Sequence, residues 1–173
     1  LILLMISPLL LVIAAAIKLD SKGPVFFRQA RMGWSGKVFH IWKFRSMYVH
    51  QPQAGVVQQA TRNDPRVTRV GAFLRRTSLD ELPNLINVVT GDMRLVGPRP
   101  TSFNAYRYKD NHLARLAIYP GMTGLWQISG RSNIDFDQRV ELDLSYIAEQ
   151  SLLLDLKILL KTPFKVFSGH GAS

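Results

Sequence analysis

The chain has 173 residues, of which 47% are apolar, and it carries 22 Lys and Arg against 12 Asp and Glu, a net charge of +10. That length is enough for one domain with a hydrophobic core. The sequence contains no cysteine, which excludes a disulfide framework and a thiolate metal site. The charge is uneven, because residues 18–76 hold twelve Lys and Arg and two acids, whereas residues 77–173 hold ten of each.

A basic block of this size suits two kinds of partner, a nucleic acid or an anionic membrane surface with anionic substrates. The block directly follows an uncharged apolar segment, and the cytoplasmic flanks of membrane helices are rich in Lys and Arg. Its placement therefore favours a membrane surface.

Residues 1–17, LILLMISPLLLVIAAAI, predict an apolar helix. A straight helix of this length covers roughly 26 Å, slightly less than the ~30 Å hydrocarbon core of a bilayer. Because the chain begins without Met and already inside apolar sequence, we expect further residues upstream, and a full span stays open. Three interpretations fit: a cleaved signal peptide ending near 14–16, a kinked spanning helix, and a re-entrant helix with Ser7-Pro8 at its apex. Pro8 removes one backbone donor and bends a helix, and the Ser7 hydroxyl can bond the carbonyl that is freed.

Short strands and helices follow in the rest of the chain. Gly23-Pro24 ends the first helix, and a strand is predicted at 25–28. A second strand at 38–45 places Lys43 and Arg45 on one face. The patterns then predict helices at 67–76, 79–90 and 103–118, a stiff loop at 97–100, a short strand at 125–128, and helices at 136–150 and 152–167. This order predicts an α+β fold, a compact helical domain with short strands.

The last predicted helix is strongly apolar, but Lys157, Lys161 and Lys165 recur on it every four residues. Such a stripe is either the solvated edge of a core helix or the polar side of an amphipathic helix lying in a membrane interface.

Asp80 and Glu81 stand at the start of the predicted helix 79–90. Ser78-x-x-Glu81 matches a capping box, so one interpretation is that the two carboxylates only cap that helix. Their surroundings favour a chemical role. Arg75 and Arg76 precede the pair, and Arg99 lies between two prolines that restrict its loop. Guanidinium groups match phosphate oxygens in charge and geometry.

An ionised carboxylate has two uses beside a phosphate. It can bind Mg²⁺ together with diphosphate oxygens, or it can attack phosphorus and form an acyl phosphate. We expect both carboxylates to have low pKa values, because the arginines and the helix dipole favour the ionised form. Lys43 and Arg45 either add positive charge to this site or form a solvated strand face.

Other chemistries have less support. No P-loop or G-x-G-x-x-G motif occurs, and the four histidines lack metal-ligand spacing. Asp135 or Asp137 is predicted to cap a helix, whereas Asp143 and Asp155 have no assigned role.

The motifs around these residues resemble those of the bacterial sugar transferases, also called monotopic phosphoglycosyl transferases. The similarity covers essentially the whole chain and is greatest to the catalytic domains of undecaprenyl-phosphate glucose or galactose phosphotransferases. The matching segments are residues 7–8, 23–29, 43–47, 77–83, 91–93, 95–100, 121–127 and 130–132. Arg94, where a small residue is common, and Ile118-Tyr119, where a basic residue is common, depart from the pattern.

The resemblance implies transfer of a sugar phosphate from a UDP-sugar to undecaprenyl phosphate, with release of UMP, as the first membrane step of polysaccharide synthesis. It implies that Asp80 is the nucleophile and that Glu81 helps to bind Mg²⁺. It further implies that Arg75 and Arg99 contact phosphates, with Lys43 and Arg45 as further candidates.

The resemblance also implies a topology. Residues 1–19 would form a re-entrant helix broken at Ser7-Pro8, and residues 20–173 a catalytic domain on the cytoplasmic face of the bacterial inner membrane. Membrane lipids are then partners and nucleic acid is not, and the larger family members suggest a homodimer. Two other functions stay open: a nucleic-acid-binding module, and a silent scaffold in which Asp80→Asn changes nothing. The sequence does not identify the sugar.

Overall fold

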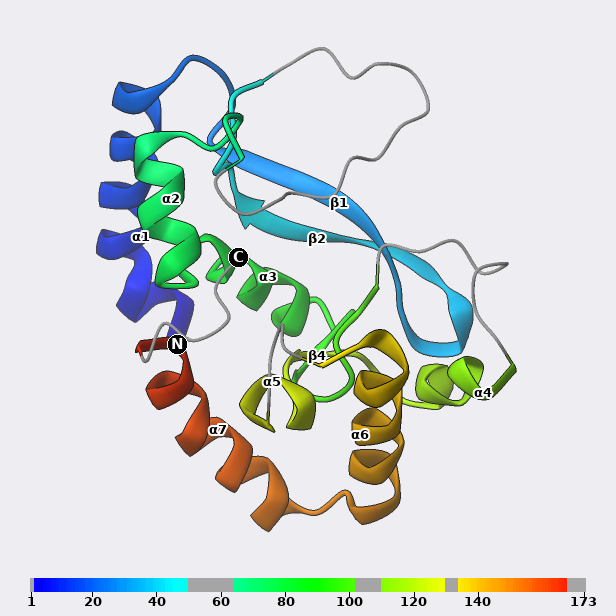
Figure 1. Ribbon diagram of the computed structural model, residues 1–173. Coiled ribbons are helices and arrows are strands. Elements are labelled where there is room, and N and C mark those ends of the chain that lie inside the picture. The colour runs from blue at the N-terminus through cyan, green and yellow to red at the C-terminus, as the bar shows by residue number, and fades with distance from the viewer. Residues whose placement is uncertain (1, 50–63, 102–109, 130–133, 168–173) are drawn as a thin grey trace.

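The computed structural model describes residues 2–49, 64–101, 110–129 and 134–167. Its elements form two groups with a short helix between them (Figure 1). The first group contains α1 (Ile2–Asp20), β1 (Phe26–Met32), β2 (Val38–Phe44) and α2 (Arg69–Arg76). The second contains β3 (Arg94–Val96), β4 (Gly121–Thr123), α5 (Leu125–Ser129), α6 (Phe136–Glu149) and α7 (Leu152–Phe167). Helix α3 (Asn84–Val89) lies between the groups, and the α+β class predicted from the sequence is confirmed.

Helix α1 continues through Pro8. Since Pro8 has no N–H for the Leu4 carbonyl, the Ser7 hydroxyl donates to that carbonyl at 2.8 Å, as the sequence predicted. Ile13 and Ile17 are buried in a cluster with Phe44 of β2 and Leu74 of α2, whereas six large apolar side chains of the helix are exposed: Leu4, Met5, Leu9, Leu11, Val12 and Leu19. Within the described residues, α1 alone is long and apolar enough to cross a membrane.

Two charged side chains fasten the C-terminal end of α1 to the domain. Arg45 donates from Nε to the Pro24 carbonyl at 2.6 Å, and from Nη1 and Nη2 to the Ser21 hydroxyl and carbonyl at 2.7 and 2.8 Å. Asp20 accepts from the Val70 N–H of α2 at 3.0 Å. Because the last carbonyls of a helix lack partners within it, an arginine at that end is stabilising.

Strands β1 and β2 form an antiparallel ribbon in which Phe26 pairs with Phe44 and Met32 with Val38. The 3₁₀ turn η1 (Trp34–Gly36) connects them. The first strand is therefore longer than the predicted 25–28, and the second closely matches the prediction.

The helix predicted at 79–90 is two elements, the 3₁₀ turn η2 (Leu79–Glu81) and α3, with Pro83 directly before α3. Ser78 has the left-handed backbone φ of 54°, and its side chain makes no capping bond. The predicted capping box between Ser78 and Glu81 is therefore wrong. A capping hydroxyl needs an extended backbone, which the turn after α2 does not allow.

The loop after β3 carries Arg99 and is braced by β4. Strands β3 and β4 are parallel, and the Gly121 N–H donates to the Pro98 carbonyl at 2.8 Å. A Cβ on Gly121 would lie 2.1 Å from the Gly97 nitrogen, so this approach of the two backbones requires glycine. Arg94, whose role was open, stacks its guanidinium 5.4 Å from the ring centroid of Tyr119.

The strand predicted at 125–128 is wrong, because this segment forms α5 and the strand is β4, which ends two residues earlier. A short apolar run fits a buried strand or a buried helix equally well. Of the helix predicted at 103–118, the structure has α4 (Asp110–Leu113) and the 3₁₀ turn η4 (Ala114–Ala117). Residues 103–109 lie outside the described residues.

Helices α6 and α7 confirm the last two predicted helices. Asp135, rather than Asp137, caps α6, in a capping box with Gln138. Asp155 accepts from the Tyr146 hydroxyl at 2.7 Å and so joins α7 to α6. The core of this group consists of Val96, Ile128, Tyr146 and Ile158.

Candidate active site

Glu81 is held by two cations that come from other elements. Lys43 of β2 donates from Nζ to Oε1 at 2.7 Å. Arg99 donates from Nη1 to Oε2 at 3.0 Å and from Nη2 to Oε1, a bidentate pair. Burial raises the pKa of Glu81, but the charges and hydrogen bonds of Arg99 and Lys43 outweigh it and hold the pKa well below its usual range. Glu81 is therefore an ionised, fixed carboxylate.

Asp80 is left without such partners. Within the part of the chain that the structure describes, its carboxylate makes no hydrogen bond or ion pair. Burial and the adjacent charge of Glu81 raise its pKa to about 6, although Lys43, Arg99 and Arg75 act in the opposite direction. The prediction of low pKa values is thus confirmed for Glu81 and wrong for Asp80, because the cations bond Glu81 directly and Asp80 only at a distance.

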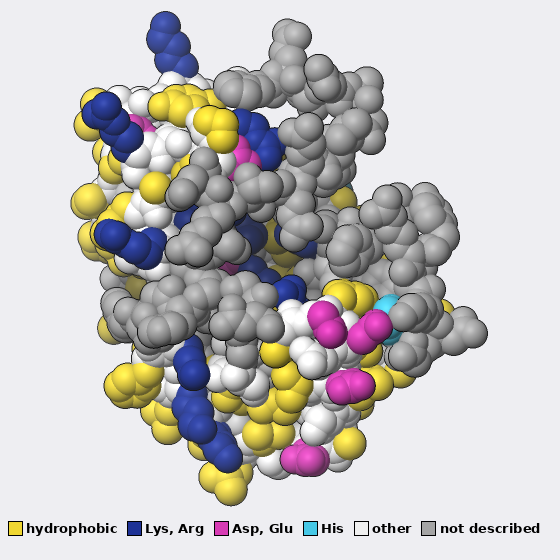
Figure 2. All heavy atoms as spheres, viewed as in Figure 1, with side chains coloured by type: hydrophobic (Ala, Val, Ile, Leu, Met, Phe, Trp, Pro, Cys, Tyr) yellow, Lys and Arg dark blue, Asp and Glu magenta, His cyan; other side chains and the backbone are white. Residues whose placement is uncertain are grey.

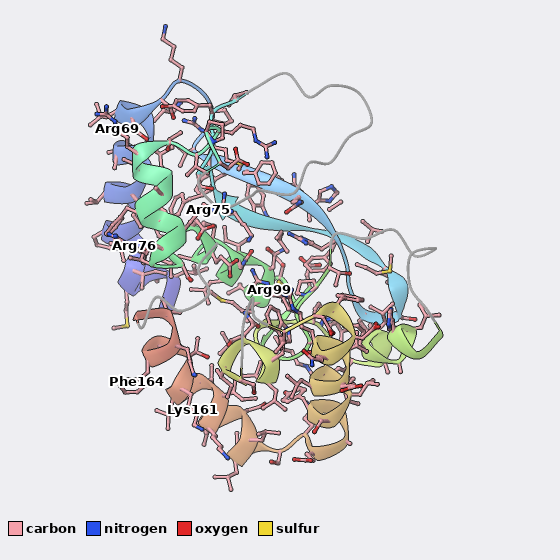
Figure 3. The ribbon with its side chains drawn as sticks, viewed as in Figure 1. Arg69, Arg75, Arg76, Arg99, Lys161 and Phe164 are labelled. Carbon is pink, nitrogen blue, oxygen red and sulfur yellow. The ribbon has the colours of Figure 1, made fainter. Side chains whose placement is uncertain are left out.

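Arg75 completes the positive surroundings of the pair. It lies in the last turn of α2, and its charge lowers the pKa of Asp80. Figure 3 shows Arg75 and Arg99 in the middle of the molecule and Arg69 and Arg76 along the outer side of α2, where both are exposed. Figure 2 shows dark blue Lys and Arg side chains in the middle of the same face, partly beneath grey atoms.

The structure brings together five of the predicted site residues, Lys43, Arg75, Asp80, Glu81 and Arg99. It does not bring Arg45 to them. Although it stands two residues after Lys43, Arg45 is only 5% exposed, and its guanidinium is bonded to the end of α1. The alternative of a solvated strand face is also wrong, because the Lys43 side chain is only 15% exposed.

A buried ion pair behind the site was not predicted. Arg115 donates from Nη2 to the Asp143 carboxylate of α6 and, at 2.8 Å, to the backbone carbonyl of Arg99. Both side chains are almost fully buried. The pair therefore fixes the backbone of the Arg99 loop. Because Arg115 and Asp143 stand 28 positions apart and belong to different elements, the sequence did not predict their contact.

A divalent cation would have few protein ligands here. No group of three or more His, Asp and Glu suited to a metal occurs among residues 2–49, 64–101, 110–129 and 134–167. Asp80 and Glu81 nevertheless supply two adjacent hard oxygen donors. Mg²⁺ is commonly bound by one or two carboxylates and completed by substrate phosphates and water, so the residues present fit this ion.

A carboxylate that has no hydrogen-bond partner among the described residues, beside three cations and a fixed carboxylate, suits reaction at a phosphoryl group. Comparison with known proteins agrees with this class of chemistry. The bacterial sugar transferase family model matches residues 1–169, and the chain belongs to this family.

Several curated relatives are similar to the chain. It is 52% identical over 181 residues to the UDP-glucose:undecaprenyl-phosphate glucose-1-phosphate transferase of Escherichia coli K12, covering 99% of this chain and 39% of that protein. It is 42% identical to the undecaprenyl-phosphate galactose phosphotransferase of Salmonella typhimurium, with 99% and 39% covered. The exopolysaccharide production protein ExoY of Rhizobium meliloti is 43% identical, with 92% and 77% covered. The chain thus spans about two fifths of the length of the first two relatives.

Proposed function

We propose that this chain transfers a sugar phosphate from a UDP-sugar to undecaprenyl phosphate. The observation that carries the proposal is the division of roles in the carboxylate pair. Glu81 is fixed by Lys43 and Arg99, while Asp80 beside it keeps both oxygens available in the described structure. The names of the relatives supply the substrates, a UDP-sugar and undecaprenyl phosphate.

The proposed reaction has two displacements at one phosphorus. An oxygen of ionised Asp80 attacks the β-phosphorus of the UDP-sugar, the bond from that phosphorus to the bridging oxygen breaks, and UMP leaves with the electron pair. A phosphate oxygen of undecaprenyl phosphate then attacks the same phosphorus and displaces Asp80. The product is a lipid-linked diphosphate sugar, and the carboxylate is regenerated.

The chain's cations have distinct tasks in this reaction. Arg99 and Lys43, which now bond Glu81, lie where they can also contact phosphate oxygens, and Arg75 stabilises the ionised form of Asp80. When bound by Glu81 and the diphosphate, Mg²⁺ would neutralise charge on the leaving UMP. The Arg115–Asp143 pair keeps the backbone of Arg99 in place.

We also propose that the chain acts at the cytoplasmic face of the bacterial inner membrane, with α1 inserted as a re-entrant helix. This rests on exposed apolar side chains along α1 and α7. The two helices lie at the same edge of the molecule in Figure 1. On α7 these are Leu152, Leu153, Leu156, Leu160 and Phe164. Lys157 and Lys161 are exposed on the same helix, so α7 has the composition of an interfacial helix.

UMP release tests the proposal. The wild-type protein, with UDP-glucose or UDP-galactose, undecaprenyl phosphate and Mg²⁺, is expected to release UMP, and Asp80→Asn is expected to abolish release. Glu141→Gln, which changes an exposed carboxylate of α6, serves as the control and should leave release unchanged. Undiminished release from Asp80→Asn would contradict the assignment of the nucleophile.

A further inference from the structure

Helix α3 carries two buried asparagines, of which one has hydrogen-bond partners for its side chain and the other does not. Asn84 is 3% exposed and Asn87 is 2% exposed. The Asn87 amide accepts from the Trp42 N–H at 3.0 Å and donates to the His40 carbonyl at 2.8 Å and to Asp92 at 3.2 Å. Asn87 is therefore a structural residue that fastens α3 to β2.

Asn84 has none of these bonds. Its Oδ1 is buried and has no hydrogen-bond partner in the described structure. Burying an amide oxygen without a partner opposes folding, so buried amides are nearly always bonded. The stability of the domain does not explain Asn84, and a bound ligand that supplies a donor would.

Asn84 lines a cleft that includes the cations of the active site. The cleft also contains Lys43 and Arg99, both bonded to Glu81. Its other lining residues are Arg31, Ile41, Met93, Pro100, Gly121 and Met122. A ligand in this cleft therefore meets three cations that suit phosphate, Arg31, Lys43 and Arg99, together with one amide oxygen that suits an uncharged donor, and apolar walls.

We propose that the Asn84 amide accepts a hydrogen bond from a hydroxyl of the transferred sugar and so is a sugar-binding residue. The inference rests on the proposed function, because it takes the ligand to be a UDP-sugar. The sugar is bonded directly to the phosphate whose phosphorus Asp80 attacks, and Asn84 shares its cleft with Lys43 and Arg99, which bond Glu81 next to Asp80. The uracil is separated from that phosphorus by a second phosphate and a ribose. An acceptor in the same cleft as these phosphate-binding cations therefore faces the sugar and not the base.

Ligand binding in an Asp80→Asn background, which keeps the UDP-sugar intact, tests the inference. Dissociation constants for UDP, UDP-glucose and UDP-galactose are measured by titration calorimetry, with and without Asn84→Ala. Loss of one neutral hydrogen bond should weaken binding of the preferred UDP-sugar roughly tenfold and leave UDP binding unchanged. Asn87→Ala is the matched control, from the same helix and with the same burial.

Thermal unfolding separates binding from structure. Asn84→Ala removes a buried amide that has no partner, so its Tm should equal or exceed that of the parent. Asn87→Ala leaves buried groups unbonded, and its Tm should fall by roughly 5 °C.

Three results would overturn the inference: a fall in Tm for Asn84→Ala like that for Asn87→Ala, equal weakening of UDP and UDP-sugar, or no weakening of either. Failure of the proposed function would show differently, as no UMP release from the wild-type protein with any UDP-sugar.

Discussion

Arg45 tests whether the structure assigns the basic residues correctly. The sequence predicts that Arg45 binds substrate phosphate, whereas in the structure it attaches α1 to the domain. If it bound substrate phosphate, Arg45→Met would impair catalysis in a stable protein. In the structure it bonds the Pro24 carbonyl and the Ser21 hydroxyl and carbonyl at the end of α1. Methionine keeps most of the side-chain length but supplies no donor, so Arg45→Met is expected to destabilise the attachment of α1 to the domain.

The magnitude follows from these contacts. Three part-buried hydrogen bonds of 2.6 to 2.8 Å from a charged donor are lost. At roughly 1–2 kcal/mol for each of these bonds, the loss is about 4 kcal/mol. In a domain of this size that lowers Tm by roughly 10 °C. The assay is thermal unfolding of the detergent-solubilised protein, together with kcat/KM for UMP release well below the Tm.

Lys43→Met, two residues earlier on the same strand, is the matched comparison. Among the described residues Lys43 bonds Glu81 alone, and Glu81 keeps its bidentate partner Arg99, so the stability loss is expected to be about 1 kcal/mol. Its kcat/KM should fall at least tenfold, whereas Arg45→Met keeps kcat/KM within about threefold. A stable Arg45→Met protein with a large loss of kcat/KM would refute this assignment of roles.

Three further experiments, one titration and two substitutions, test other parts of the account. Burial and the charge of Glu81 raise the pKa of Asp80 to about 6. A carbon-13 NMR titration of the metal-free protein should therefore show this carboxyl losing its proton as the pH rises through about 6. A titration midpoint near pH 4 would contradict the burial argument. Asp143→Ala leaves Arg115 buried without its ion-pair partner. Denaturant unfolding should therefore show a loss of about 3–5 kcal/mol in stability, and an unchanged unfolding midpoint would show that the ion pair does not stabilise the protein. A re-entrant α1 with its apex at Ser7-Pro8 keeps residue 3 inside the bilayer, whereas a spanning α1 brings it near the periplasmic surface. A membrane-impermeant maleimide should therefore not label Leu3→Cys, unique in this cysteine-free chain, in intact cells, and labelling there would indicate a spanning helix.

The closing helices and the hydrogen bond of Ser7 beside Pro8 were predictable because local signals decide them. The period of apolar residues marks α6 and α7, and the missing N–H of Pro8 calls for a local donor, which Ser7 supplies. The segment 125–128 was not predictable in this way. Its Ile128 is buried with Val96 and Tyr146 from other elements, so tertiary packing decides its conformation.

The candidate site shows the same division. Asp80 and Glu81 were predictable as a candidate pair because Arg75 and Arg76 stand just before them, and Arg99 because prolines flank it on both sides. Arg45 was predicted to lie with Lys43 at the site because alternate residues of a strand share one face. Alternation does not determine which distant group a long side chain contacts. Asn84 could not be predicted as a candidate site residue from the sequence, because the observation that points to it is a buried amide oxygen without a hydrogen-bond partner in the described structure.

The central claim is that Asp80 forms a covalent phosphosugar intermediate, and mass spectrometry of the intact protein tests it most directly. Incubation with UDP-glucose and Mg²⁺, or with UDP-galactose, but without undecaprenyl phosphate, should add one hexose phosphate, map to Asp80 after proteolysis and release one UMP per active site. Later addition of undecaprenyl phosphate should remove the adduct. A protein that turns over with the lipid present, yet forms no adduct and releases no UMP without it, would contradict the account and indicate direct attack by the lipid phosphate.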